Sequence, residues 1–284
     1  MRLFLSCYSC VLPGMKRSLI TRFVSSSLLL VLAFSCAAQS EKPSPTPDDK
    51  ADKIIQKAVQ VLGGDRYLGV RTIIGRGFFT DYKDGVSTIP LRFVDYIVYP
   101  DKERTEFIGG GARVIQTNDH DRGWIFDSAA ITLKDQTAAQ LEDFRLAMRT
   151  GVENLLRGGW KTQGGQLSYV GRREAGVGRR NETVRLTYPD GFSIEYEFAA
   201  TDGLPAKVLY KRKEKRPDSD EVEELAEEDR LYKPITVDGV VAFYVLDHFR
   251  NGVQTSRINY ESVEFNKTIA DSLFAKPANI KAIK

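Results

Sequence analysis

Between Thr183 and Phe265, apolar and polar residues alternate along a series of extended segments. Period-two alternation closed by Asp-Gly and Asn-Gly turns is a strong signal for β-hairpins. The pattern predicts an antiparallel meander with one apolar and one solvated face, and we expect this meander to form the wall of a hydrophobic pocket. The turns that separate its strands are Pro189-Asp190-Gly191, Thr201-Asp202-Gly203, Asp238-Gly239 and Asn251-Gly252.

Further extended segments precede the meander. Leu68–Asp81 and Val86–Pro100 are expected to be long strands that pair across an Asp84-Gly85 turn. Glu103–Ile108 and Ala112–Thr117 flank a triple glycine and are expected to form another hairpin. The first half of the domain should therefore also be a sheet.

Two local features qualify this sheet. Gly75-Arg76-Gly77 lies inside a predicted strand, which indicates a β-bulge or a close backbone approach. Lys211–Arg230 is a run of charged residues, which we interpret as a solvated hairpin tip or a mobile loop.

Two segments have helical periodicity instead. Asp49–Leu62 carries acidic residues in its first turn and ends before Gly63-Gly64, as a short amphipathic helix would. Thr137–Arg157 has apolar residues three and four positions apart, which predicts a single helix that ends at Gly158-Gly159. We take this second helix as the candidate lid over the sheet. Its apolar stripe consists of Leu141, Phe144, Met148, Val152, Leu155 and Leu156.

Aromatic residues are frequent on the predicted strands and are candidates for the lining of a cavity. Two interpretations remain open at this point. In the first, the helix stripe and the sheet face fill each other as in an ordinary core. In the second, a curved sheet is too wide for its helices and leaves an apolar pocket. The candidate cavity-lining residues are Phe78, Phe93, Tyr96, Trp124, Phe126, Phe192, Tyr196, Phe198 and Phe243.

The N-terminal region has the features of an export signal. Met15-Lys16-Arg17 and Arg22 precede an apolar run of 12 residues, Phe23 to Phe34, which is short for a membrane span. We assign residues 1–35 to this signal, with Met15 as an alternative start. Without its four basic residues the chain has 37 basic and 38 acidic side chains, so its charge does not favour nucleic-acid binding.

Cys36 is the candidate lipid anchor. Ala33-Phe34-Ser35-Cys36 resembles a bacterial lipobox, and the alternative is ordinary cleavage after Ala38. Residues 36–49 are small, polar and proline-rich, which indicates a flexible tether. No cysteine follows Cys36, so the domain beyond it can form neither a disulfide nor a thiolate metal site.

Candidate catalytic chemistry is sparse. The two histidines, His120 and His248, are far apart in the sequence. Asp119-His120-Asp121 could serve a metal site or a hydrolase, although a solvated turn is the simpler interpretation. No zinc-protease, nucleophile-elbow or phosphate-loop motif is present in the sequence. We therefore expect no enzymatic activity, no catalytic residue, no metal and no cofactor.

The order of the predicted elements and three short stretches resemble the LolA/LolB-like superfamily, especially its divergent outer-membrane lipoprotein-sorting members. The resemblance covers residues 50–277 and leaves 278–284 as a C-terminal tail. It implies an α+β fold, an unclosed antiparallel β-barrel with helices across its open side. The three stretches are Asp202-Gly203-Leu204-Pro205-Ala206-Lys207, Val237-Asp238-Gly239-Val240, and Phe265-Asn266 with Leu273-Phe274.

The resemblance also implies a function. In this superfamily the cavity shelters acyl chains from water. We therefore expect a monomeric periplasmic carrier or sorting factor for the acyl chains of lipids or lipoproteins. It would be held at the outer-membrane surface through a lipid on Cys36, or be soluble in the periplasm, with no nucleic-acid partner. The alternative is a structural or sensor module of the same fold with a filled core.

Two features of the superfamily have no counterpart in the sequence. No arginine can be matched to the residue that latches the lid, and Arg71, Arg76 and Arg92 are equally plausible by position. No exposed apolar loop matches the membrane-inserting loop of the anchored receptor.

Overall fold

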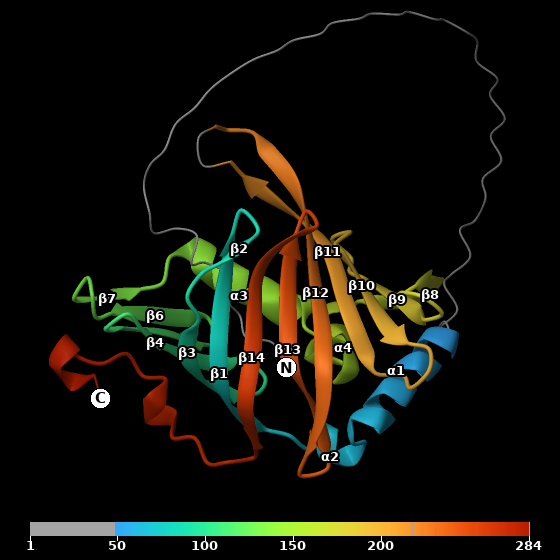
Figure 1. Ribbon diagram of the computed structural model, residues 1–284, viewed down its shortest axis with the longest axis horizontal. Helices are drawn as coiled ribbons and strands as arrows, with labels where there is room; N and C mark the ends of the chain where they lie inside the picture. Colours follow the sequence, from blue (N-terminus) through green and yellow to red (C-terminus); the bar gives the residue numbers. More distant parts are fainter. Residues whose placement is uncertain (1–48, 217–218, 284) are drawn as a thin grey trace, which may run out of the picture. The chain divides into compact units, whose positions relative to one another are not determined.

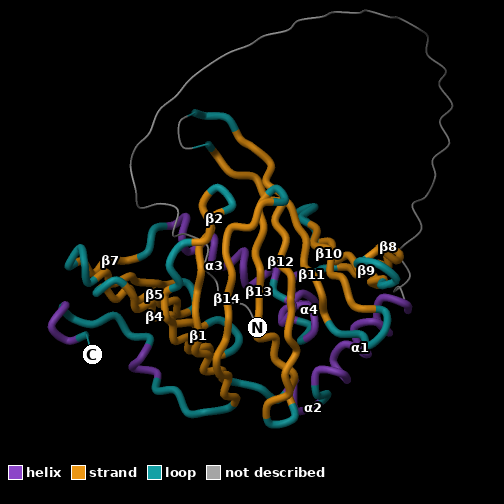
Figure 2. Tube along the Cα trace, viewed as in Figure 1, coloured by secondary structure: helices purple, strands orange, loops and turns teal. Residues whose placement is uncertain are grey.

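The computed structural model of the chain describes residues 49–216 and 219–283. The export signal, Cys36 and the tether up to residue 48 lie outside the described residues. The described chain forms one antiparallel sheet and a few helices (Figures 1 and 2). The strands are β1 Thr72–Lys83, β2 Val86–Ser87, β3 Leu91–Val98, β4 Lys102–Gly109, β5 Ala112–Asp119, β6 Arg122–Asp127, β7 Thr132–Asp135, β8 Gln166–Glu174, β9 Arg180–Thr187, β10 Ser193–Ala199, β11 Pro205–Lys215, β12 Val222–Val237, β13 Val240–Arg250 and β14 Val253–Phe265. The helices are α1 Asp49–Leu62, α2 Asp65–Leu68, α3 Ala138–Thr150 and α4 Val152–Leu156, with 3₁₀ turns η1 Gly159–Gln163, η2 Asp271–Leu273 and η3 Ile280–Ala282.

The sheet has 14 strands in the order β7-β6-β5-β4-β3-β1-β14-β13-β12-β11-β10-β9-β8, with the short β2 paired to β1. Strands β7 and β8 stand at the two ends, and within the described residues they do not pair with each other. This confirms the predicted α+β fold with an unclosed antiparallel sheet. The first strand, β1, lies beside the last, β14, so this one pairing joins the two halves of the sheet.

The predicted meander is confirmed, because each strand from β9 to β14 pairs with the next one in sequence. Asp238 and Asn251 have positive φ values, as tight hairpin turns of the Asp-Gly and Asn-Gly type require. Most of the charge run belongs to the end of β11 and the start of β12, which form a projecting hairpin (Figure 1), as one of its two interpretations expected. Lys211 pairs with Glu224 across this hairpin at 2.6 Å.

The N-terminal helix is confirmed as α1, but the single helix predicted over Thr137–Arg157 is wrong. A capping box at Thr137 begins α3, and the chain then leaves the helix at Gly151, whose φ of −58° and ψ of 142° are extended. Glycine is a poor helix former, which allows α4 to begin anew beyond it. No helix of the described ranges is both long enough and apolar enough to cross a bilayer.

The early strands are shorter than predicted. The strand expected over Val86–Pro100 divides into β2 and β3, because the segment that contains Pro90 lies between them. Proline lacks the N–H that a central ladder position requires. Leu68 belongs to the short helix α2, and the first strand begins only at Thr72.

The bulge predicted at Gly75-Arg76-Gly77 is confirmed. The register of β1 against β14 shifts between Arg76 and Gly77. A Cβ atom added to Gly77 would lie 2.0 Å from the carbonyl oxygen of Asn259. The two strands therefore approach too closely at this point for any side chain.

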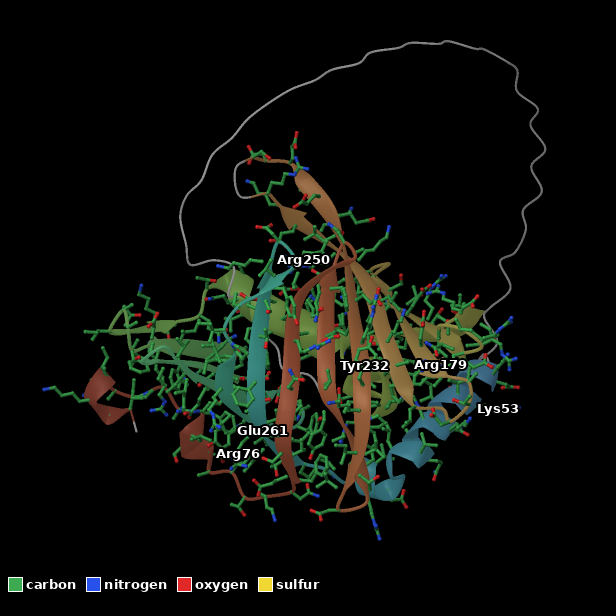
Figure 3. The ribbon with its side chains drawn as sticks, in the orientation of Figure 1. Lys53, Arg76, Arg179, Tyr232, Arg250 and Glu261 are labelled. Atoms are coloured by element: carbon green, nitrogen blue, oxygen red, sulfur yellow. The ribbon has the colours of Figure 1, made fainter. Side chains whose placement is uncertain are left out.

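We call the face of the sheet that carries α1, α3 and α4 the inner face. The main core lies here, where α1, α4 and η1 pack on the strands of the meander. The opposite, outer face of the central strands is polar, and it carries Arg76, which pairs with Glu264, and Tyr232 (Figure 3). The largest fully buried side chains of the inner face include Tyr196, Phe198, Phe93, Leu155, Leu186 and Ile194.

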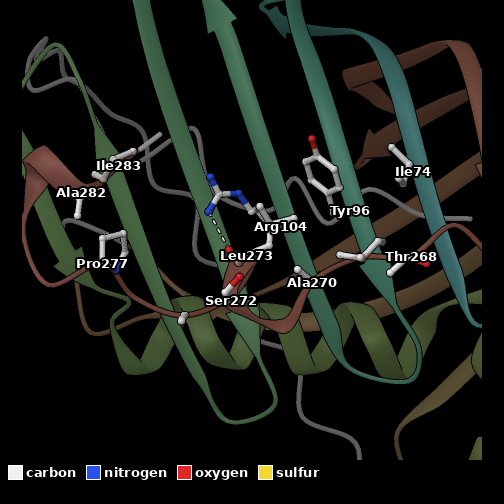
Figure 4. Close-up of a pocket in the computed structure, with 12 residues that line it drawn as sticks. Ile74, Tyr96, Arg104, Thr268, Ala270, Ser272, Leu273, Pro277, Ala282 and Ile283 are labelled. Carbon is white, nitrogen blue, oxygen red and sulfur yellow. Dashed lines mark hydrogen bonds between the residues drawn. The ribbon is translucent and has the colours of Figure 1, made fainter.

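The C-terminal segment covers part of the outer face of β3 to β6. Trp124 donates a hydrogen bond from Nε1 to the carbonyl oxygen of Phe274 at 2.9 Å. Arg104 donates to the carbonyl oxygen of Leu273 at 2.9 Å (Figure 4). A pocket of about 340 Å³ remains between this segment and Tyr96. Ile283, near the chain end, packs against a second apolar cluster that includes Trp124.

Candidate functional site

Side chains fill one part of the inner face and leave another part open. Beneath α4, between Val152 and Phe243, the space left free is about 20 Å³, which is close to the room that one water molecule needs. A cleft of about 1220 Å³ lies elsewhere, between the helices and the turns that end β3 and β5. It exceeds the usual size of a small-molecule pocket, and it is the candidate functional site.

The cleft has two walls. Phe144 and Met148 of α3 line the helix wall, and Ile97 and Tyr99 line the sheet wall. Phe144 is buried, at 4% exposure, and Met148 is half-buried. Together with Leu68 and Pro100, these four side chains supply apolar surface to the cleft. Charged side chains surround it, and the ones that line it are Arg71, Asp101, Lys102, Glu103, Asp121, Glu142, Arg145, Arg149, Glu153 and Arg157.

Helix α3 is attached to the far side of the sheet, across the inner face. Arg212 of β11 donates to Asp143 at 3.0 Å, and both side chains are mostly buried. Arg149 donates to Asp190 at 2.9 Å, and its guanidinium lies 3.9 Å from the ring centre of Tyr188. The helix wall of the cleft is therefore fixed by contacts with the meander.

Arg157 fastens the end of α4 to the segment before β1. Its guanidinium donates to the backbone carbonyl oxygens of Tyr67 at 2.9 Å, Val70 at 3.0 Å and Leu68 at 3.2 Å. It also lies 4.2 Å from the ring centre of Tyr99. Bonds from one charged group to three carbonyls hold this corner of the cleft in place.

Ionisable groups lie deep in the sheet wall. Asp95 is 1% exposed and Glu103 is 2% exposed, and the Thr105 hydroxyl donates to Asp95 at 2.9 Å. Burial raises the pKa of Asp95 to about 8, against the effect of this hydrogen bond. Burial also raises the pKa of Tyr260 well above its usual value, and the charges of Asp95 and Glu103 add to that shift.

In the predicted polar cluster Asp119-His120-Asp121, Nε2 of His120 lies 3.5 Å from Asp119, whereas the exposed Asp121 lies beside Arg122. His120 Nδ1 lies 2.7 Å from Asp101 of the preceding turn, and this hydrogen bond raises the pKa of His120. Asp119 pairs with Lys102 at 3.3 Å. In the described part of the chain, no group of three or more His, Cys, Asp or Glu residues is placed to hold a metal ion.

The second histidine belongs to a separate charged network on β12 and β13. His248 lies 2.5 Å from Asp229 and 3.0 Å from Glu227. Arg250 donates to Glu227 at 3.0 Å. This network lies near the attachment of α3, since Arg212 also donates to Glu227, at 2.8 Å.

The predicted cavity-lining aromatics are not brought together in one place. Phe93, Tyr196, Phe198 and Phe243 are buried in the main inner core, and Phe192 packs against its edge. The others follow the strand alternation to the outer face. There Trp124 and Phe126 form the second cluster, Tyr96 lines the smaller pocket, and Phe78 lies under Arg92.

The predicted lid residues divide between two places. Val152, Leu155 and Leu156 of α4 are buried in the main core, whereas Phe144 and Met148 of α3 line the cleft. Leu141 is half-buried. Within the described residues, no residue of the meander lines the cleft, so the open space lies beside the early strands and not where the meander predicted it.

Sequence reasoning missed Asp95, Glu103, Arg157 and Tyr260. One signal was available for the first of them. Asp95 stands at an inward position of an otherwise alternating strand, Leu91–Val98, and an acid at a buried strand position is unusual enough to indicate a site.

No protein-family model matches the sequence, and no curated protein matches it. Solved structures do match. A DUF1329 family protein from Desulfovibrio piger aligns with a TM-score of 0.54 and 11% identity, over 79% of this chain and 97% of that chain. A domain from Vibrio parahaemolyticus assigned to outer membrane lipoprotein sorting aligns with a TM-score of 0.50 and 11% identity, over 80% and 97%.

The fold is LolA-like. This confirms the fold that the resemblance implied. The likeness covers 79% and 80% of this chain, and at 11% identity it concerns the fold alone. What a protein with the LolA-like fold does depends on its site, which here is the cleft.

Proposed function

We propose that this protein binds acyl chains of lipids or lipoproteins in the cleft and acts as a non-catalytic carrier or sorting factor of the bacterial envelope. The observation that carries the proposal is the cleft of about 1220 Å³, with Phe144, Met148, Ile97 and Tyr99 on its walls. Export to the periplasm and a lipid on Cys36 complete the proposal. An open cleft under α3 favours the carrier over a module with a filled core.

The energetics suit reversible binding. Burial of a chain of about sixteen carbons at ~0.8 kcal/mol per CH₂ contributes on the order of 12 kcal/mol before the costs of ordering are subtracted. The remainder after those costs is compatible with tight but reversible binding. Neither a covalent step nor a titrating residue is needed for such a carrier.

Native mass spectrometry and a fluorescent fatty-acid probe test the proposal. We expect the protein, purified without denaturation, to carry an amphiphile and to bind the probe after the amphiphile is removed. Met148→Arg introduces a charge into the cleft wall and should weaken probe binding at least about tenfold. Ala139→Arg, at an exposed position of the same helix, is the control and should leave the affinity unchanged. A ligand-free protein that also ignores the probe would contradict the proposal.

The anchor requires a separate experiment. Metabolic labelling with a palmitate analogue should mark the wild-type protein and leave Cys36→Ala unmarked. An unlabelled wild-type protein would support the alternative, cleavage after Ala38 and a soluble periplasmic carrier.

A further inference from the structure

We propose that the pocket of about 340 Å³ under the C-terminal segment is a second binding site, and that its ligand is a compact, uncharged amide. The pocket lies on the outer face of the sheet and shares no described lining residue with the cleft. The inference is therefore independent of the proposed carrier function. It follows from the N–H donors that remain on Arg104, from the hydroxyl groups beside them and from the charges of the lining.

The pocket lies between a wall of strands and a wall of irregular chain (Figure 4). Ile74 of β1, Tyr96 of β3 and Arg104 of β4 form the sheet wall, and the strand register places these three residues side by side in one row. Leu273 and Ile283 of the C-terminal segment add apolar surface to the other wall. The volume is at the lower end of the range for small-molecule pockets, so the ligand must be compact.

Arg104 is the cationic side chain of this lining, and it is 6% exposed. Its charge is balanced by Glu106, whose Oε1 lies 2.8 Å from Nε and 2.7 Å from Nη2. Nη1 donates to the carbonyl oxygen of Leu273 at 2.9 Å. A guanidinium has five N–H donors, so two of them have no acceptor within the described chain. A ligand that uses these two donors needs an acceptor atom but no negative charge.

Hydroxyl groups lie near these donors. Tyr96 is paired directly with Arg104 across the two strands, so the two side chains are neighbours on the outer face. Ser272 precedes Leu273, the residue whose carbonyl oxygen Arg104 contacts, and it also lines the pocket. Neither hydroxyl forms a hydrogen bond with another residue of the described chain. Each can therefore accept a hydrogen bond from a ligand.

An uncharged amide matches both kinds of group. Its carbonyl oxygen accepts from Arg104, as the carbonyl oxygen of Leu273 already does, and its N–H donates to Tyr96 or Ser272. An ammonium group would lie near the guanidinium with no carboxylate to receive it, since no described residue of the lining is acidic. A carboxylate would compete with Glu106 for one guanidinium and would lie close to its negative charge.

An NMR titration with four ligands of one carbon skeleton tests the inference: cyclohexanecarboxamide, cyclohexanecarboxylate, cyclohexylmethylamine and cyclohexylmethanol. The two tryptophans of the chain report where the ligand binds. The indole N–H of Trp124 donates to Phe274 of the C-terminal segment, whereas the indole N–H of Trp160 donates to Leu155 in the inner core. We expect the amide to shift the Trp124 signal to saturation and to leave the Trp160 signal unchanged. The amide should bind at least about fivefold more tightly than each of the other three ligands.

Variants assign the preference to the proposed groups. Arg104→Lys keeps the ion pair with Glu106 but loses the remaining N–H donors, because an ammonium group has only three. The double variant Tyr96→Phe with Ser272→Ala removes two hydroxyls at positions that are not buried. Each variant should reduce the advantage of the amide over the alcohol at least about threefold. Arg113→Lys changes the other partner of Glu106, outside the pocket lining, and is the matched control that should retain the full advantage.

The Trp124 signal without ligand shows whether the C-terminal segment stays in place in each variant, and the double variant decides the question if Arg104→Lys releases the segment. Equal affinities for the four ligands, or tighter binding of the carboxylate or the amine, would overturn the amide site. A Trp124 signal that no ligand shifts, or an advantage that the double variant retains in full, would also overturn it. These outcomes leave the carrier function standing, because that proposal is tested in the cleft with a fatty-acid probe and Met148→Arg.

Discussion

The two halves of the inner face differ in the side chains that their strands direct inward. In the half packed by α1 and α4, successive inward residues of β10 are apolar, namely Ile194, Tyr196 and Phe198, and the space is filled. In the half beside the cleft, the paired inward residues Glu103 and Asn118 form one polar row, and Thr105 lies in the next. An apolar helix cannot cover polar rows without the loss of their hydrogen bonds. This difference indicates that the polar side chains on the inner face of the early strands, as well as the width of the sheet, keep the cleft open.

The largest expected effect tests packing in the two halves. Leu155→Ala removes a side chain that is 1% exposed in the filled half, and it should lower the free energy of unfolding by about 4 kcal/mol. Met148→Ala removes a side chain from the wall of the open cleft and should lower the free energy of unfolding by less than about 1 kcal/mol. Urea denaturation measures both. Similar losses would mean that the cleft half is packed as tightly as the other.

The second effect concerns the polar rows and depends on pH. The folded protein retains the proton of Asp95 up to a pKa of about 8, whereas the unfolded chain releases it near pH 4. Unfolding therefore releases one proton between pH 5 and 7, and the free energy of unfolding falls as the pH rises, by about 3 kcal/mol from this group.

Asp95→Asn should remove this dependence, and urea denaturation of wild type and variant at several pH values measures the difference. The exposed Asp121→Asn serves as the control and should keep the wild-type slope. Identical slopes for wild type and Asp95→Asn would show that Asp95 is ionised in the fold.

A third prediction concerns the corner between the two halves. Arg157→Lys keeps the charge but cannot reach three carbonyl oxygens with a planar fork. We expect a loss of about 2 kcal/mol in the free energy of unfolding, since hydrogen bonds from a charged donor are removed. Arg179→Lys, at an exposed position, should have no measurable effect. An unchanged free energy of unfolding in Arg157→Lys would mean that the apolar contacts of α4 suffice to hold this corner.

The smallest effect should arise where α3 meets the meander. Asp143→Asn weakens the contact with Arg212 and should lower the free energy of unfolding by about 0.5–1 kcal/mol. Hydrogen exchange should become faster in the amides of α3 and stay unchanged in α1. Glu142→Gln, whose partner Arg145 is exposed on the same helix, is the control. Equal exchange in wild type and Asp143→Asn would show that other contacts hold α3.

Local signals in the sequence were sufficient for most of the fold. The Asp238-Gly239 and Asn251-Gly252 turns determine hairpins through their own backbone preferences, so the meander could be predicted without knowledge of the rest. The periodicity of α1 was equally local. The break at Gly151 was not predictable in the same way, because apolar spacing continues through it and only the dihedral angles separate α3 from α4.

The site was harder to predict because it depends on which face of the sheet each residue occupies. Phe78 and Phe79 are adjacent in sequence, yet Phe79 joins the inner core and Phe78 does not. Alternation alone does not say which of two neighbouring aromatics points inward. The approach of Tyr260 to Asp95 depends on the pairing of β1 with both β3 and β14, which is a long-range property of the chain.

The pairing of β1 with β14 also has a consequence for the order of folding. Strand β1 belongs to the half of the sheet made first, and its partner is the last strand of the chain. The hydrogen bond of the Trp124 indole likewise cannot form until Phe274, 150 residues further along the chain, is present. Such contacts are slow to form because a long loop must close first. The early half therefore keeps an unpaired strand edge until the last strand has been made, and a chain that is interrupted before β14 would be left with an edge open to aggregation.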